Sequence, residues 1–320
     1  MTATAILSRV LRARFTPLIV LAALMVLVPM LAPSSFHLRV AALVWIFALA
    51  ALGLTILMGY AGQVSLGHAG FVGIGAYAVA IGPARLGLDP LLCLVLGAVL
   101  AGAIAYGVGR PILKLKGYYL AIATLGFGVI VALVLHSEAE ITGGPDGMAV
   151  SRLSLFGWRV TGALNWYWVT SGALLIGALL ALNIAASPTG RALRALHDSE
   201  VAAAGTGIDV GAKKLAAFVV AAVYGAVAGG LLAAMNGLIT PEAASFSHSI
   251  ELVAMVIIGG LGSVFGTVVG AAFLVVLPQM LTALQEYEQA VLGLLIMVFM
   301  IFLPQGIVPS IRAYILERLP

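Results

Sequence analysis

Residues 165–186 have the sequence NWYWVTSGALLIGALLALNIAA, which contains no charged side chain. A run of about 20 such residues is long enough to cross a bilayer as an α-helix. The stretch that follows, residues 187–200, is polar and basic and has the sequence SPTGRALRALHDSE. An apolar run that ends in a short polar segment predicts a chain that crosses the membrane and exposes loops between its crossings.

The composition extends this prediction to the whole chain. Over 320 residues, 62% are hydrophobic and 9% are charged, whereas soluble domains carry about 25% charged residues. The 38 glycines are typical of helices that pack closely in lipid. Further apolar segments lie at about 16–33, 39–58, 60–82, 90–110, 118–136, 215–236, 250–264, 264–280 and 289–308. We therefore expect an all-α, polytopic integral membrane protein with about ten transmembrane or re-entrant helices, forming one domain over residues 1–320.

Charge predicts the orientation, because positive residues near span ends are retained in the cytoplasm. With ten crossings, the inner segments hold 12 Lys and Arg against four acids, and the outer segments hold four Arg against eight acids. Both termini are then cytoplasmic, with an outer loop at about 137–164 and an inner loop at about 187–214. The apolar run after Arg9, Arg12 and Arg14 is long for a cleaved signal sequence, and we expect it to remain as the first helix.

A glycine-rich segment, residues 59–77 (GYAGQVSLGHAGFVGIGAY), carries polar side chains at predicted membrane depth. Polar groups at that depth are buried in protein or line a watery cavity, and ionisable ones are candidates for function. Two interpretations of Gln63, Ser65 and His68 therefore stay open. They line a solute translocation path, or they form hydrogen bonds between helices and stabilise packing.

A second glycine run, residues 259–266 (GGLGSVFG), lies at the predicted inner turn of the segment 250–280. Two half-helices meeting at this break, or plain close packing of helices, explain it equally. Glu251 is expected to anchor the outer end, with a role at a solute entrance as the alternative. In the outer loop, the turn-forming cluster TGGPDG at 142–147 precedes a short helix or strand near 153–160. This loop is either a docking surface or a simple connection.

The inner loop has the signals of two short helices. Ser187 is a good N-cap, with Pro188 at the first helical position, and Asp198 or Ser199 can cap a second turn. Arg194 and Asp198 stand four residues apart, a spacing that favours an ion pair on a helix. We expect the two helices to lie across the cytoplasmic face and to contact a soluble partner. The alternative is a solvated basic loop with no partner.

Several kinds of chemistry have no motif here. The sequence contains no phosphate-binding G-x-x-x-x-G-K-[ST] loop, no H-E-x-x-H, no G-x-S-x-G and no Cys/His spacing for a metal. The single cysteine, Cys93, cannot form an intrachain disulfide. We expect no catalytic residue, no metal site and no cofactor held by this chain. A stand-alone channel or carrier stays open as an alternative, although an ion-driven carrier usually needs several buried charges.

Five segments, taken together, resemble one family. They are residues 59–77, 114–128 (KLKGYYLAIATLGFG), 142–147 (TGGPDG), 190–210 (GRALRALHDSEVAAAGTGIDV) and 258–270 (IGGLGSVFGTVVG). In this order they are similar to the permease subunits of branched-chain amino acid ABC importers of the LivM type, within the class that includes ribose-type permeases.

The resemblance implies a multi-pass protein of the bacterial inner membrane that forms part of a path for branched-chain or related hydrophobic amino acids. It implies three kinds of protein partner and no nucleic acid: a second, related permease, two cytoplasmic ATPase subunits that hold ATP–Mg, and a periplasmic solute-binding protein. A same-class permease for urea, an aromatic acid or a sugar remains the alternative. The residues expected to contact the ATPase are Gly190, Arg191, Arg194, Asp198, Glu200, Ala203 and Gly207.

Overall fold

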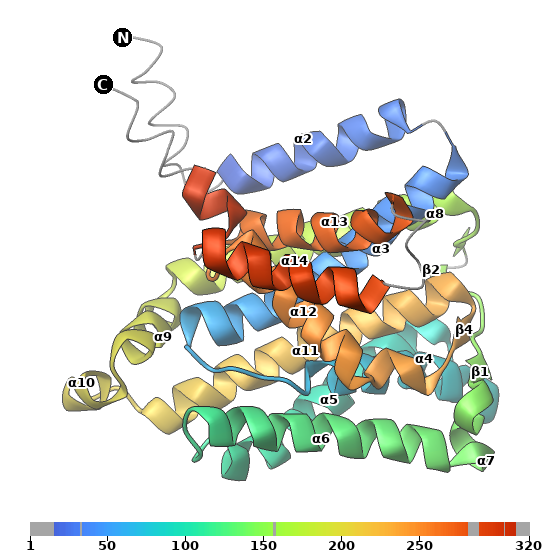
Figure 1. The fold of residues 1–320 in the computed structure, drawn as a ribbon. Helices are drawn as coiled ribbons and strands as arrows, with labels where there is room; N and C mark the ends of the chain where they lie inside the picture. Colours follow the sequence, from blue (N-terminus) through green and yellow to red (C-terminus); the bar gives the residue numbers. More distant parts are fainter. Residues whose placement is uncertain (1–15, 33, 156–157, 281–287, 304, 312–320) are drawn as a thin grey trace, which may run out of the picture.

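The computed structural model describes residues 16–32, 34–155, 158–280, 288–303 and 305–311. Most of its long helices run in roughly the same direction, as expected for helices that share a bilayer, and α12 (Phe246–Gly259) is inclined to them (Figure 1). The other long helices are α2 (Thr16–Leu31), α3 (Ser35–Leu54), α4 (His68–Leu86), α5 (Pro90–Ile112), α6 (Tyr118–Ser137), α8 (Ala163–Ala186), α11 (Val210–Asn236), α13 (Val264–Met280) and α14 (Glu288–Phe302).

The helix lengths agree with a multi-pass membrane protein. Among the described residues, six helices are long and apolar enough to cross a membrane, and α2, α12 and α13 are shorter apolar helices. The six spanning helices are Ser35–Tyr60, His68–Leu86, Pro90–Ile112, Tyr118–Ser137, Ala163–Ala186 and Val210–Asn236. The all-α class is thus confirmed, whereas the total of about ten crossings stays a prediction. Both chain ends, predicted to be cytoplasmic, lie outside the described residues.

Two predicted helices are interrupted where glycine is frequent. The helix expected at 60–82 is wrong in its start, because residues 61–67 are not helical and α4 begins only at His68. The preceding helix α3 ends as a π-helical turn, η1 (Thr55–Tyr60), and the left-handed φ of +66° at Gly62 turns the chain out of it. The predicted break within 250–280 is confirmed, since α12 ends at Gly259 and α13 starts at Val264.

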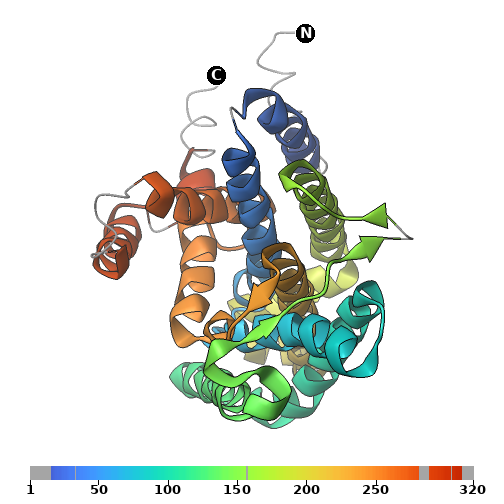
Figure 2. The same ribbon diagram turned by 90° about the vertical axis from the view of Figure 1, so that its right-hand side faces the viewer.

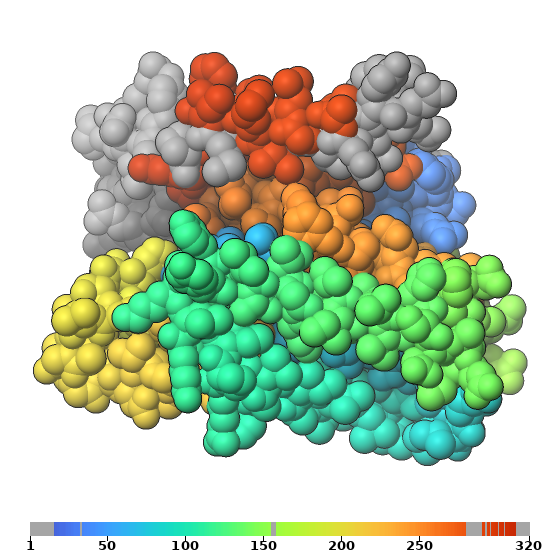
Figure 3. Space-filling view, turned by 60° about the horizontal axis from the view of Figure 1, so that its bottom comes forward, coloured from blue at the N-terminus to red at the C-terminus, as the bar shows by residue number. Residues whose placement is uncertain are grey.

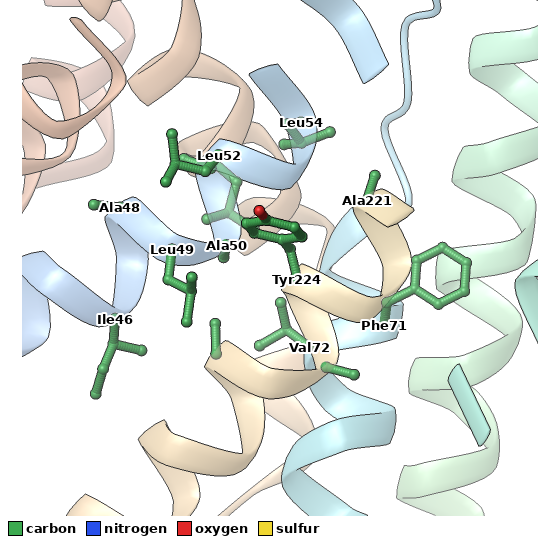
Figure 4. Close-up of a cluster of buried hydrophobic side chains, with 14 of the residues drawn as sticks. Ile46, Ala48, Leu49, Ala50, Leu52, Leu54, Phe71, Val72, Ala221 and Tyr224 are labelled. Carbon is green, nitrogen blue, oxygen red and sulfur yellow. The ribbon is translucent and has the colours of Figure 1, made fainter. Parts of the chain in front are cut away.

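The centre of the bundle consists of α3, α4 and α11, which have the most buried spanning segments. Small residues allow α4 and α11 to approach closely. A Cβ atom at Gly75 would lie 2.5 Å from Ala226 Cα, and one at Gly229 would lie 2.7 Å from the Val72 carbonyl carbon. Figure 4 shows the ring of Tyr224 on α11 beside the labelled side chains of α3. The Tyr224 hydroxyl donates to Gly177 O on α8 at 2.7 Å, and this hydrogen bond connects the centre of the bundle to α8.

One end of the bundle carries short strands and turns (Figure 2). Strand β1 (Met148–Ala149) pairs antiparallel with β4 (Leu238–Ile239), and β2 (Ser154–Leu155) pairs with β3 (Trp158–Arg159). The β2–β3 hairpin confirms the strand alternative predicted near 153–160. The remaining elements at this end are α7 (Ala139–Thr142), η2 (Gly144–Asp146) and η3 (Pro241–Ala244).

The opposite end carries α9 (Pro188–Asp198) and α10 (Glu200–Gly205) (Figure 1). Loops that charge assigns to the same side of the membrane also meet in the structure. On the strand-bearing side, Arg39 donates to Asn236 Oδ1 at 3.3 Å and Ser154 donates to Asp89 Oδ2 at 3.1 Å. This grouping agrees with the charge-based topology, and which of the two ends faces the cytoplasm stays a prediction.

Candidate functional site

The segment between α8 and α11 folds as two short helices, as predicted, because each helix has a capping side chain. Ser187 Oγ accepts from Gly190 N at 3.2 Å at the start of α9, and Ser199 Oγ accepts from Ala202 N at 3.2 Å at the start of α10. Asp209 Oδ1 accepts from Ala212 N at 3.0 Å at the start of α11. Three caps within 23 residues satisfy N–H groups that each helix start would otherwise leave unpaired.

Helix α9 is amphipathic, with one face on the bundle and the other exposed. Leu193 and Leu196 are buried against the bundle, whereas Arg191 and Asp198 are exposed. The predicted ion pair between Arg194 and Asp198 is wrong. The Arg194 guanidinium instead lies 5.8 Å from the centroid of the Tyr60 ring, on η1. A cation over an aromatic face is attracted by the ring quadrupole, so Arg194 connects α9 to the end of a spanning helix.

Glu200 joins three parts of the chain through ion pairs. Its Oε1 pairs with Lys214 Nζ on α11, and its Oε2 lies 3.6 Å from Lys116 Nζ in the loop between α5 and α6. The Lys214 side chain is only 5% exposed, and the Lys116 side chain is 74% exposed. The pair with Lys214 therefore neutralises a buried charge, while the pair with Lys116 is screened by solvent.

The residues predicted for the ATPase contact fall into two structural groups. Gly190 and Ala203 are buried, and a Cβ atom at Gly190 would lie 2.5 Å from Ala185 O, so glycine is required by the tight turn after α8. Gly207 is exposed and has a φ of +83°, which places it in the left-handed region at the turn before α11. The exposed side chains available to a partner are Arg191, Arg194 and Asp198, with Glu200 partly exposed.

Helix α9 lies on the turn that follows η1. A Cβ atom at Gly62 would lie 3.3 Å from His197 Cγ and 3.4 Å from His197 Cα, so the backbones approach closely at this point. Together with the Arg194–Tyr60 contact, this gives α9 two contacts with residues 60–62. A displacement of α9 would therefore directly move the start of the non-helical segment 61–67.

The same turn contacts the second glycine-rich break. Tyr60 Oη donates to Gly262 O at 2.9 Å, and a Cβ atom at Gly59 would lie 2.7 Å from Gly262 Cα. One helix turn earlier, the hydroxyls of Thr55 and Thr267 are 2.5 Å apart. The two glycine-rich breaks, near residues 59–62 and 259–263, thus pack against each other. Helix α9 contacts the first of them.

The three residues predicted for a translocation path are buried within the chain. Gln63 is 3% exposed, Ser65 is 1% exposed and His68 is 0% exposed. Residues 61–67 are not helical, and burial alternates over residues 62–65, so that Gln63 and Ser65 are buried while Val64 is 42% exposed. Within these four residues, the polar side chains are therefore inside and the valine side chain is outside.

The inward polar groups have unused hydrogen-bonding capacity. Within the described part of the chain, neither the Gln63 amide nor the Ser65 hydroxyl has a hydrogen-bond partner. The segment itself is held to α6, since Leu66 N donates to Thr124 Oγ1 at 3.1 Å and a Cβ atom at Gly67 would lie 2.7 Å from the Thr124 carbonyl carbon. The side chains of Gln63 and Ser65 are thus buried without hydrogen-bond partners among the described residues, next to the exposed Val64. Buried polar groups are normally hydrogen-bonded, so this segment is incompletely stabilised in this conformation.

The surface near this segment is formed by α6 on one side and by α12 and α14 on the other. Figure 3 shows α6 across the front of the molecule, with α12 and α14 above it and blue atoms from the region of η1 visible between them. Helix α6 has only 22% of its spanning window buried. The exposed face of residues 61–67 is thus reached from the side of the bundle that α6 borders.

Sequence reasoning missed three features of this site. Val201 on α10 is 81% exposed, so α10 presents a large apolar side chain next to the partly exposed Glu200. The positive-inside rule gives no partner for Lys214 and Lys116, because their shared partner Glu200 lies 14 and 84 residues away in sequence. Tyr60 was part of a recognised motif, but its two contacts were not predictable from spacing along the chain.

A metal site has no support in the described part of the chain, where no group of three or more His, Cys, Asp or Glu side chains could hold an ion. The site therefore consists of a surface helix pair, two packed glycine-rich turns and the partly exposed, non-helical segment 61–67. Such an arrangement can transmit movement and line a path.

Comparison with known proteins gives consistent matches. Residues 36–300 match the family described as "Branched-chain amino acid transport system / permease component". Over 297 residues the chain is 34% identical to the high-affinity branched-chain amino acid transport system permease protein LivM of Escherichia coli strain K12, with 85% of this chain and 70% of that protein covered.

Two further relatives are more distant. The permease protein LivH of Salmonella typhimurium is 26% identical over 286 residues, covering 82% of this chain and 90% of LivH. A probable LivH permease of Methanocaldococcus jannaschii is 29% identical over 238 residues, covering 70% of this chain and 73% of that protein. No solved structure gives a significant match.

Proposed function

The chain belongs to the family of branched-chain amino acid transport permease components, and we propose that it forms part of the membrane path of an ABC importer and receives the ATPase movement through α9 and α10. A permease subunit of this family is a transporter component and not an enzyme. The solute we propose is a branched-chain or related hydrophobic amino acid, because all three relatives given above are named for branched-chain amino acid transport.

The observation that carries the coupling role is the position of α9 on the two packed glycine-rich turns. Arg194 and His197 contact Tyr60 and Gly62, and Tyr60 is hydrogen-bonded to Gly262. A force on the exposed face of α9 would therefore act on two helix interruptions together. Rigid elements that contact in this way can move as a unit during opening and closing.

A second permease is proposed as the partner that completes the path. The chain is similar to both LivM and LivH proteins, which supports a pair of related but different subunits. The exposed face of residues 61–67 lies beside α6, where Val64 is accessible. We place the path along this face, so that apolar side chains of the segment meet an apolar solute and the buried Gln63 and Ser65 support the segment from behind.

Two cytoplasmic ATPase subunits and an extracytoplasmic binding protein complete the proposed assembly in the inner membrane. The ATPase would supply ATP–Mg, because this sequence has no phosphate-binding loop. The binding protein would dock at the end that carries the two β-ribbons and the 137–164 loop. The exposed residues of α9, together with Val201 of α10, are the proposed ATPase contact.

The test of this function is an assembly of the chain with its companion permease, ATPase and binding protein in proteoliposomes. We expect uptake of labelled leucine that depends on ATP and on the binding protein. Val201→Asp should weaken ATPase association by about tenfold, equivalent to ~1.4 kcal/mol, because it places a carboxylate at an apolar contact. Leu238→Asp, at the opposite end and also exposed, is the control and should leave ATPase association unchanged.

Three results would count against the proposal. Leucine uptake by the purified chain without an ATPase would assign a stand-alone channel or carrier. Full ATPase association by the Val201→Asp variant would remove α10 from the contact. Uptake of urea, a sugar or an aromatic acid in preference to leucine would keep the permease role and overturn the solute.

A further inference from the structure

A cleft between α5 and α11 is separate from the contacts that α9 makes with residues 60–62, and it is a second candidate ligand-binding site. It is a cavity of about 810 Å³, lined by the last turns of α5 and the first turns of α11. Its polar lining comes from Tyr106, Arg110 and Lys114, and the remaining lining is apolar or glycine, for example Leu113 and Val219. Basic side chains at one edge of an otherwise apolar cleft suit a ligand that has both an anionic and a hydrocarbon part.

Arg110 holds its guanidinium on the wall of the cleft. The guanidinium lies 4.3 Å from the centroid of the Tyr106 ring, one turn earlier in α5, and donates to the Tyr106 hydroxyl. Side chains on a helix tilt toward its N-terminus, so this contact keeps the positive charge beside the apolar part of α5. Arg110 is exposed, Tyr106 is 47% exposed and both line the cavity, so the charge is accessible to a ligand there.

The two cations have no counter-charge of their own. Within the described part of the chain, neither Arg110 nor Lys114 forms an ion pair, whereas Lys116, two residues further, is paired with Glu200. Arg110 lies in the last turn of α5 and Lys114 in the turn that follows this helix, and both line the same cavity. A phosphate group between them would supply the missing negative charge, and guanidinium groups match phosphate geometry well.

An apolar groove continues from this cleft along the same two helices. It has a volume of about 400 Å³ and is lined by side chains of α5 and α11 that include Ala98, Val99 and Val223. Val99 is 62% exposed, so the groove faces outward from the bundle. From Ala98 to Arg110 the helix rises about 18 Å, close to the roughly 15 Å that one leaflet of the hydrocarbon core provides.

We propose that the α5–α11 cleft binds one anionic phospholipid, with its phosphate at Arg110 and Lys114 and an acyl chain in the groove toward Ala98. The depth of the groove, its apolar walls and its single cationic end match the two parts of such a lipid in one leaflet. Basic pockets between spanning helices bind anionic headgroups in this way. The site depends on the membrane location of the chain and not on the proposed ATPase coupling.

The test measures lipid retention by the full-length chain in detergent, using native mass spectrometry with phosphatidylglycerol as the probe and phosphatidylcholine as the neutral comparison. Wild type should retain one phosphatidylglycerol after the micelle is removed. The double variant Arg110→Gln/Lys114→Gln should lower the retained fraction at least about tenfold, as expected for two basic residues that contact an anionic lipid. The matched control is Arg152→Gln/Arg159→Gln, which removes the same charge from exposed residues at the opposite end and should retain the lipid.

A second variant tests the cleft without changing its charge. Ala216 is exposed and lines the cavity, so Ala216→Trp should fill the cleft and lower retention while the chain stays folded. Equal retention of both lipids by wild type, or unchanged retention in Arg110→Gln/Lys114→Gln, would overturn the proposal. Displacement by inorganic phosphate would assign a free anion instead. Loss of the lipid when the companion permease is bound would assign the cleft to a subunit contact.

Discussion

Gly59 and Gly262 are packed backbone against backbone, so that a Cβ atom at Gly59 would lie 2.7 Å from Gly262 Cα. These residues belong to the two helix interruptions, one after α3 and one between α12 and α13, and more than 200 residues of sequence separate them. We expect Gly59→Ala to force these turns apart, at a cost of about 1–3 kcal/mol or more for an overpacked contact. The measurement is the thermal unfolding midpoint of the purified chain, together with leucine uptake by the assembly.

The control for this substitution is Gly126→Ala on α6, where no atom lies within 4 Å of the added Cβ. Alanine is a better helix former than glycine by about 1 kcal/mol, so this variant should be unchanged or slightly more stable. A Gly59→Ala variant as stable and as active as wild type would show that the two turns do not need their close contact.

The buried Lys214 gives a prediction about stability. Glu200→Gln leaves the Lys214 ammonium without its carboxylate, and Lys214 is 5% exposed. Removing one partner of a buried pair costs about 3–5 kcal/mol, and because the Glu200 side chain is 32% exposed we expect a smaller cost, about 1–3 kcal/mol. Lys214→Met/Glu200→Gln should recover most of this loss, because it removes the unpaired charge. Chemical denaturation of the four variants in a double-mutant cycle measures the coupling.

The matched control is Lys116→Gln, which removes the other partner of Glu200. Lys116 is 74% exposed, so its pair is screened and should contribute at most about 0.5 kcal/mol. Equal losses from Lys116→Gln and from Glu200→Gln would contradict the view that burial of Lys214 sets the strength of this connection.

The sequence predicted the parts of the fold that depend on local chemistry. The apolar runs identify the spanning helices, Ser187 and Ser199 cap the two helices of the inner loop, and the glycine run after residue 258 ends α12. Each of these depends on residues close together in the chain. The contact between residues 59–62 and 259–263 was not predictable, because two glycine runs show where a helix is interrupted and not what packs against the interruption.

The candidate path shows why side-chain chemistry alone was a weak guide. Gln63 and Ser65 are buried within the chain and Val64 is exposed, and their role in a translocation path stays a prediction. The apolar run over 60–82 gave no sign of this alternation, because residues 61–67 are not helical. Arg194 was predicted to pair with Asp198, but the nearby Tyr60 ring, from a distant part of the sequence, is its actual neighbour.

Thiol labelling can test the direction of this segment. In a Cys93→Ala background, which removes the buried native thiol, Val64→Cys should react with a small membrane-permeant maleimide because Val64 is 42% exposed. Ser65→Cys should be protected in the same state, since Ser65 is 1% exposed. Labelling is measured by the mass shift of the intact chain with and without ATP. Faster reaction at position 65 than at position 64 in the resting state would contradict the orientation described here.

Tyr60 gives the sharpest test of the coupling route. Tyr60→Phe keeps the ring beneath Arg194 and removes the hydrogen bond from Oη to Gly262 O, a loss of about 0.5–1.5 kcal/mol. We expect the assembly to form and ATP hydrolysis to continue, while the amount of leucine transported per ATP falls, because α9 no longer moves the two turns together. The measurement is the ratio of leucine uptake to phosphate release in proteoliposomes.

Tyr224→Phe is the matched control, because it removes a hydrogen bond of similar kind, from Tyr224 Oη to Gly177 O, at the centre of the bundle. Its cost in stability should be comparable, but its ratio of uptake to hydrolysis should equal that of wild type, because Tyr224 does not contact α9. Lowered ratios in both variants would show that Tyr60 acts through general stability, and normal ratios in both would show that the hydrogen bond to Gly262 is not needed for coupling. A lowered ratio in Tyr60→Phe alone assigns the transmission of the ATPase movement to the contact between residues 60 and 262.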